Sequence, residues 1–165
     1  MVEKSPGFTV VELLVTIAII ALVSAIAVPH FIGWLPDYRL RAAAHDLFSN
    51  FQKAKLTAVK RNVNTTVCFH GSGYVMFVDT DIDFEKDSVE ETVTQVDWED
   101  YKSISVNPAA ITFDSSSGQP CIAFRPNGIP ADNGGGFASG TTPISNTNDR
   151  TIRVIISQAG HIRID

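Results

Sequence analysis

The chain has 165 residues, which suits one domain or one small domain with an appendage. Hydrophobic residues make up 44% and charged residues 19%, so the chain is not disordered throughout. The net charge of -5 argues against a protein that coats nucleic acid. Two cysteines exclude a four-thiolate zinc site and a dense disulfide scaffold.

The apolar residues are concentrated near the N-terminus. Leu13 to Val28 contains no charged residue, and extension to Phe8 gives 21 residues interrupted only by Glu12. A helix of 21 residues is about 31 Å long, which matches the hydrocarbon core of a bilayer. We therefore expect a transmembrane helix over residues 8–28, with Pro29 at the exit; a buried core helix is the alternative.

A cleaved secretory signal peptide is a second alternative for this segment. Ala25 and Ala27 form a small-residue pattern before Val28, as such a cleavage site requires. Glu12 argues against this alternative, because a carboxylate near the centre of a membrane helix costs about 3 kcal/mol and a secretion signal has no use for it. An acid in an apolar run is therefore a functional candidate that needs a partner.

The run Gly7-Phe8-Thr9-Val10-Val11-Glu12, with the apolar segment and Pro29 behind it, resembles the type IV prepilin signature. The resemblance implies a leader of residues 1–7, cleavage between Gly7 and Phe8 by a prepilin peptidase, and N-methylation of Phe8. Glu12 would then be the fifth mature residue, as in that family. The Phe8 ammonium of one subunit can pair with Glu12 of another, which offsets two desolvation costs. The alternative is that the Glu12 side chain merely extends toward the membrane–water interface and has no partner.

Apolar residues then recur at steps of mostly three and four, which predicts an amphipathic helix from about Asp37 to Arg61 within a periplasmic half, residues 29–61. Asp37 is the expected N-cap. The helix carries six basic and two acidic residues, so its other face is either solvated or packed against acidic neighbours in a filament. The apolar positions are Leu40, Ala44, Leu47, Phe48, Phe51, Ala54, Ala58 and Val59.

The remaining residues, 62–165, are expected to form a periplasmic β domain. Local strand order predicts two small antiparallel sheets packed on the long helix, hence an α+β fold. Residues 133–149 are rich in Gly, Ser, Thr and Asn, and we expect them to be a weakly ordered loop. The expected strands are Thr65–Phe69, Tyr74–Val78, Thr92–Val96, Ser103–Val106, Ile111–Phe113, Cys121–Phe124, Thr151–Ile156 and His161–Ile164.

Three segments resemble the GspH/FimT branch of the pseudopilins: Phe77-Val78-Asp79-Thr80-Asp81, Phe124-Arg125-Pro126-Asn127-Gly128 and the closing Gly160-His161-Ile162-Arg163-Ile164. The resemblance implies a structural minor pseudopilin of a type II secretion system, in a short periplasmic filament for protein export. The alternative is a FimT-like minor pilin of a type IV pilus with a DNA-uptake role.

The implied partners are other pilins or pseudopilins, the prepilin peptidase and the inner membrane. The implied topology is single-pass in the cell inner membrane, with a cytoplasmic N-terminus and a periplasmic C-terminal domain.

Acidic residues gather between Asp79 and Asp100, where ten acids meet one Lys. Asp79, Asp81, Asp83 and Glu90 have the spacing of a calcium loop, but Phe84 stands where such a loop needs Gly. The segment before them is an expected strand rather than a helix. We therefore interpret this region as a solvated acidic loop that can meet a basic partner, and we predict no metal.

A small basic patch is expected on the last hairpin, where Arg153, His161 and Arg163 fall on one face. DNA-binding members of the family that the chain resembles carry Gly-Arg-x-Arg here, whereas this chain has His161 in place of the first Arg. We favour a solvated polar face over DNA contact and do not expect nucleic acid as a partner.

Cys68 and Cys121 lie in expected strands of a domain that would face the oxidising periplasm. A disulfide would close a 53-residue interval and contribute about 4 kcal/mol in the chain-entropy model. Two buried free thiols are the alternative.

Enzyme motifs are absent from the sequence: it has no G-x-S-x-G, Walker A loop or H-E-x-x-H. The four histidines, His30, His45, His70 and His161, share no metal-ligand spacing. We expect neither enzymatic activity nor a cofactor.

Overall fold

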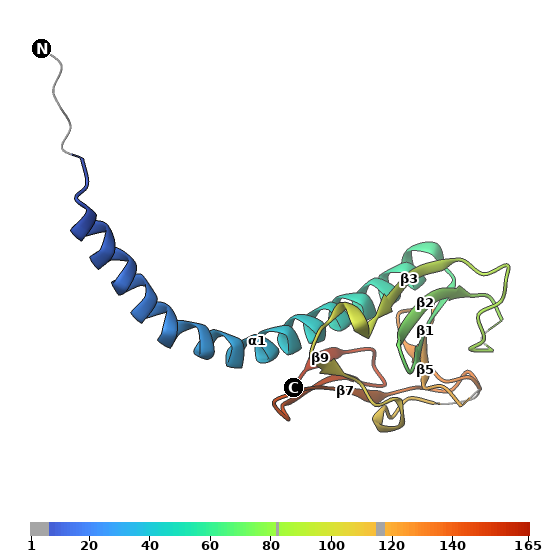
Figure 1. Cartoon of the computed structure of the whole chain (residues 1–165). Helices are drawn as coiled ribbons and strands as arrows, with labels where there is room; N and C mark the ends of the chain where they lie inside the picture. Colours follow the sequence, from blue (N-terminus) through green and yellow to red (C-terminus); the bar gives the residue numbers. More distant parts are fainter. Residues whose placement is uncertain (1–6, 82, 115–117) are drawn as a thin grey trace, which may run out of the picture. The chain divides into compact units, whose positions relative to one another are not determined.

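The computed structural model describes residues 7–81, 83–114 and 118–165. It divides into a unit that ends at Leu35 and a compact unit, Pro36–Asp165. Helix α1, Val10–Arg61, belongs to both units, and all the strands lie in the second. Figure 1 shows the helix followed by two sheets of antiparallel strands, which confirms the predicted α+β class.

Helix α1 is continuous from Val10 to Arg61, which confirms the predicted long N-terminal helix but corrects the expected N-cap at Asp37. Pro29 and Pro36 both lie inside the helix, and Asp37 is an interior residue rather than an N-cap. Each proline removes one backbone hydrogen bond, but the remaining bonds of the turn continue the helix. The helix begins instead after Thr9, whose Oγ1 accepts a hydrogen bond from the Glu12 amide at 3.2 Å.

The first unit contains the helix segment that is long and apolar enough to cross a membrane, the one such segment among the described residues. None of its most apolar 18-residue window is buried. Its large apolar side chains, from Phe8 to Trp34, are all more than half exposed. The described residues of this unit therefore leave a large apolar surface exposed.

The first sheet has the strand order β3-β2-β1-β5-β6. The expected hairpin of β1 and β2 is confirmed, with His70 opposite Gly73 at the turn. The central strands β1 and β5 are buried on both faces. The bounds are β1 Asn64–His70, β2 Gly73–Asp79, β3 Thr92–Asp97, β5 Cys121–Phe124 and β6 Pro130–Ala131.

The second sheet has the order β4-β7-β8-β9. Strands β8 and β9 match the expected last hairpin closely. The bounds are β4 Ile104–Ser105, β7 Gly140–Asn146, β8 Thr151–Ile156 and β9 Ile162–Ile164. Two short 3-10 helices, Trp98–Asp100 and Pro108–Ala110, flank β4.

Strand β7 shows that the expectation of a weakly ordered loop at 133–149 was wrong. The strand lies between β4 and β8, and its inward side chains Thr142, Ile144 and Asn146 are buried. Two of these three side chains are polar, so the sequence does not show the alternation of apolar and polar residues by which a half-buried strand is recognised.

The expectation of a strand at Ile111–Phe113 was also wrong. Those residues form no strand, and Thr112 donates its amide to the Thr141 carbonyl of β7 at 3.1 Å. The segment therefore lies against β7 without joining the sheet.

The core of the second unit lies between α1 and both sheets. Phe51 is fully buried, with its ring centroid 6.1 Å from that of Phe69 and 6.0 Å from that of Phe113. Phe48 is only half-buried and Val59 is 48% exposed, so two of the residues expected on the buried face lie at its edge or outside it. The buried helix residues are Leu40, Ala43, Ala44, Leu47, Phe51, Ala54 and Ala58.

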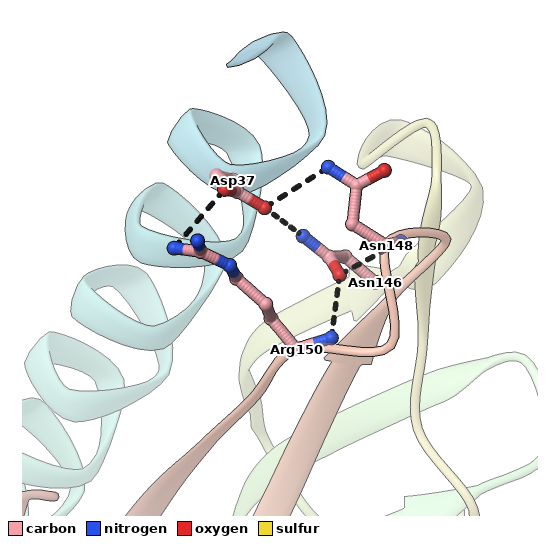
Figure 2. Close-up of polar contacts among 4 residues, drawn as sticks. All are labelled: Asp37, Asn146, Asn148 and Arg150. Atoms are coloured by element: carbon pink, nitrogen blue, oxygen red, sulfur yellow. Dashed lines mark hydrogen bonds and ion pairs between the residues drawn. The ribbon is translucent and has the colours of Figure 1, made fainter. Parts of the chain in front are cut away.

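Asp37 attaches the start of this packed helix segment to the β7–β8 turn (Figure 2). Its Oδ1 accepts hydrogen bonds from the side-chain amides of Asn146 at 2.8 Å and Asn148 at 3.2 Å. Its Oδ2 pairs with the Arg150 guanidinium at 3.2 Å. Asn146 in turn accepts from the backbone amides of Asn148 and Arg150, so the turn itself is held in shape.

These contacts favour the ionised form of Asp37. The hydrogen bond from Asn146 lowers the pKa of the Asp37 carboxyl most strongly, desolvation opposes it, and Asn148 and Arg150 lower the pKa further. A carboxyl whose pKa is lower in the folded than in the unfolded chain stabilises the fold above its unfolded pKa. That contribution is lost as the pH falls through the folded pKa.

We expect Asp37→Asn to lower the melting temperature of the full chain at pH 7, and to lower it less at about pH 3. The reason is that the stability contributed by a carboxyl with a lowered pKa begins to shrink below the unfolded pKa of about 3.9. Thermal melts in detergent micelles, followed by near-ultraviolet circular dichroism, measure the difference. Asp149→Asn is the matched control, because Asp149 is exposed in the same turn and its left-handed backbone (φ 57°) suits Asn. An equal loss at both pH values would contradict the role of the charge.

Candidate assembly surfaces

The N-terminal segment places the residues of the prepilin signature at the start of α1. Phe8 and Glu12 are exposed, and Glu12 lies in the first turn of the helix. Between residues 7 and 35 Glu12 is the one carboxylate in the sequence. A negative charge in the first turn is favoured by the helix dipole, but it remains costly wherever the segment is surrounded by apolar groups.

Among the described residues, nothing requires a glycine at position 7. A Cβ added there would meet nothing within 4 Å, and its backbone is not in the left-handed region. The described residues therefore tolerate a side chain at this position.

The acidic loop brings Asp79, Asp81 and Asp83 together, with one carboxylate oxygen of each within 4.8 Å of the others. Glu90 is not part of that group. Its carboxylate accepts hydrogen bonds from the Thr80 amide at 2.8 Å and the Asp87 amide at 3.2 Å. The four acids of the calcium-like spacing thus do not converge, and we assign no metal to them.

Phe84 explains how the acidic loop keeps its shape. It adopts the left-handed backbone conformation (φ 65°) that a calcium loop reserves for Gly, and its ring is buried against the far face of the first sheet. Glu90, also buried, ties the two ends of the loop through its hydrogen bonds. The loop is therefore a folded feature with an acidic outer surface.

Arg153, His161 and Arg163 are exposed on the outer face of the second sheet, while Val154, Ile156 and Ile162 face the core. Arg153 exchanges both backbone hydrogen bonds with Asp165, at 2.9 and 2.8 Å. Residues paired in this way share a face, so the Asp165 side chain is on the same face of the sheet as Arg153. The patch is accessible but carries an acid among its bases, which weakens its attraction for phosphate.

Cys68 and Cys121 face each other across β1 and β5 and form a disulfide. Both are buried with Phe77 and Phe84 in a small cluster on the side of the first sheet that faces away from α1. The disulfide therefore lies directly beneath the aromatic ring that anchors the acidic loop.

Some polar partners of the structure had no local signal in the sequence. Asn146, Asn148 and Arg150 contact Asp37 across more than a hundred residues, and turn residues of this composition are common. Tyr101, which donates its hydroxyl to Asp46 at 2.8 Å, is a similar case.

Comparisons with known proteins agree on the class of molecule. Residues 43–160 match the family model described as type II transport protein GspH, and residues 4–28 match the prokaryotic N-terminal methylation motif. No curated protein matches the chain by sequence.

Solved structures share the fold. The type IV minor pilin FimU of Pseudomonas aeruginosa aligns with a TM-score of 0.57 at 19% identity, over 78% of this chain and 90% of that one. The minor pseudopilin EpsH from the Type 2 Secretion System of Vibrio cholerae aligns with a TM-score of 0.51 at 11% identity, over 77% and 96%. The GspH model covers more than half of the present sequence. This chain therefore belongs to the GspH family of pilin-like proteins and carries the N-terminal methylation motif.

Proposed function

We propose that the chain is a structural minor pseudopilin of a type II secretion system, incorporated into a short periplasmic filament for protein export. The observation that carries this proposal is the uncovered apolar half of α1 directly behind a prepilin motif. Fully burying one Val, Leu or Ile side chain contributes about 1.5–3 kcal/mol, so this segment is strongly driven into a bilayer or against other helices.

The proposed topology follows from the same segment. Residues 1–7 are a leader, residues 8–28 span the inner membrane once, and residues 29–61 with the β domain 62–165 lie in the periplasm. The prepilin peptidase removes the leader and methylates Phe8. A structural rather than enzymatic role agrees with the family to which the chain belongs.

Assembly has a defined electrostatic step in this proposal. Cleavage creates an ammonium on Phe8, and Glu12 is the carboxylate available near it. In a staggered bundle the ammonium of one subunit meets Glu12 of the next. Neither charge is stable alone in an apolar bundle, so the pair fixes the axial register of neighbouring helices.

A minor pilin of a type IV pilus is the second candidate, favoured by the fold shared with FimU. Deleting the gene in its native host separates the two. Loss of exported enzymes from the medium with normal surface pili supports the secretion system. Loss of pili with normal export would replace the first proposal with the second.

We expect Gly7→Glu to leave an uncut precursor in the membrane, because the peptidase requires a small residue before the cut while the chain itself does not. Gly7→Ala is the control and should be processed much more completely. Electrophoretic mobility of the two variants, with and without co-expressed peptidase, measures cleavage. Normal maturation of Gly7→Glu would remove the prepilin assignment.

We expect Glu12→Val to insert normally, since the change removes a charge from an apolar segment. Its incorporation into filaments should fall at least about tenfold, because an unpaired charge left from a buried ion pair costs about 3–5 kcal/mol. Thr16→Val, one turn further along the helix, is the matched control without a charge change. Incorporation of Glu12→Val at the native level, measured in sheared filament fractions, would show that the pair is dispensable.

A further inference from the structure

A small pocket lies within the second unit, where the start of the packed helix segment meets the β7–β8 turn. It has a volume of about 260 Å³, and two arginines and one aspartate give its lining a net charge of +1. Two aliphatic side chains lie beside these charges. The pocket is lined by Asp37, Leu40, Arg41, Arg150, Thr151 and Ile152. Cationic and apolar groups together suit an anion that carries a hydrocarbon part.

Arg41 supplies a charge that the fold itself does not use. Asp37 and Arg41 are four residues apart in α1, so they lie on one side of the helix. Both oxygens of Asp37 bond to side chains of the β7–β8 turn (Figure 2). Within the described part of the chain, the exposed Arg41 guanidinium makes no hydrogen bond or ion pair. Its donors are therefore available to a ligand in the pocket.

Arg150 provides the second cation. Its guanidinium pairs with Asp37 at 3.2 Å, yet its side chain is 64% exposed, against 15% for Asp37. A guanidinium has five N–H donors in a planar fork, so one ion pair leaves several of them available. Asp37 thus fixes the position of Arg150 beside the pocket without occupying all of its donors. Asp149, the other acid of this part of the chain, does not line the pocket.

The place of the pocket in the chain indicates a source for the anion. Asp37 follows Trp34 by three residues, and Trp34 is the last large exposed apolar residue of the first unit. Tryptophan is enriched at the level of the lipid headgroups. Anionic headgroups attract basic residues that directly follow a membrane span. Arg41 is such a residue in the proposed topology.

We propose that Arg41 and Arg150 bind the headgroup phosphate of an anionic phospholipid. The inference rests on the proposed membrane topology and adds a ligand to it. The two guanidinium groups donate charge-assisted hydrogen bonds to the phosphate oxygens, for which their planar forks are well suited. Leu40 and Ile152 contact the glycerol and the first acyl carbons. A lipid bound there stabilises the second unit while the subunit is still in the membrane.

Thermal melts of the full chain in neutral detergent micelles test the site, with near-ultraviolet circular dichroism as the readout. A ligand that binds only the folded state raises the melting temperature, and we expect a rise of about 3 °C with dioleoyl phosphatidylglycerol. Dioleoylglycerol has the same acyl chains without the phosphate and should give little rise. Inorganic phosphate at the same concentration should also give little, because it neither enters the micelle nor contacts the apolar lining.

Two arginine variants show whether the rise depends on the pocket. Arg41→Gln should lose most of the rise, whereas Arg39→Gln should keep it. Arg39 is two residues from both Asp37 and Arg41, so it does not face them, and it does not line the pocket. Each variant is compared with itself without lipid, so a change in its starting stability does not affect the result. Native mass spectrometry from the same micelles should show at least about fivefold less phosphatidylglycerol retained by Arg41→Gln.

An equal rise in the two variants would mean general attraction to a charged micelle surface and would overturn the site. An equal rise with inorganic phosphate would mean that the pocket takes a free anion and would overturn the lipid as its occupant. Fractionation of the native host separates this inference from the proposed function. A chain that sediments with the inner membrane but shows no rise dependent on Arg41 rejects the lipid site alone. A chain found outside the membrane fraction rejects the proposed topology itself.

Discussion

The described residues leave the apolar half of α1 exposed, and the rest of the structure depends on this constraint. One helix serves two environments: from Leu40 onward its inner face is buried by two sheets, whereas before Leu35 its apolar side chains are exposed. Burial of apolar area is the dominant favourable term in association. The exposed apolar segment therefore has to pack against a membrane or other helices for the molecule to function. This arrangement fits a pilin-like subunit.

The second unit is built to hold its end of α1 and its acidic loop in place. Asp37 fastens the helix to the β7–β8 turn one turn before the first buried residue, Leu40. The disulfide joins β1 to β5 beneath Phe84, and that ring anchors the acidic loop. Each of these contacts restrains a surface element against a two-sheet core, so the surfaces offered to a neighbour are largely formed before assembly.

The sequence predicted the features whose signals are local. The prepilin signature depends on residues spaced within one helix, and strands such as β1 and β8 have apolar, β-branched patterns. Strand β7 was missed because Thr142 and Asn146 face inward, where the rule expects apolar side chains. The contact of Asn146 with Asp37 spans 109 residues, and no pattern in one sequence indicates it.

We infer that this chain matures as a pilin-like subunit and enters the membrane by its own α1. The most direct measurement is the mass of the N-terminal peptide of the protein isolated from membranes of its native host. We expect a peptide that begins at Phe8 and carries one methyl group on its amine. A peptide that begins at Val28 would instead mean release by a secretory signal peptidase, and an intact Met1 would mean no processing. Either result would contradict maturation as a pilin-like subunit.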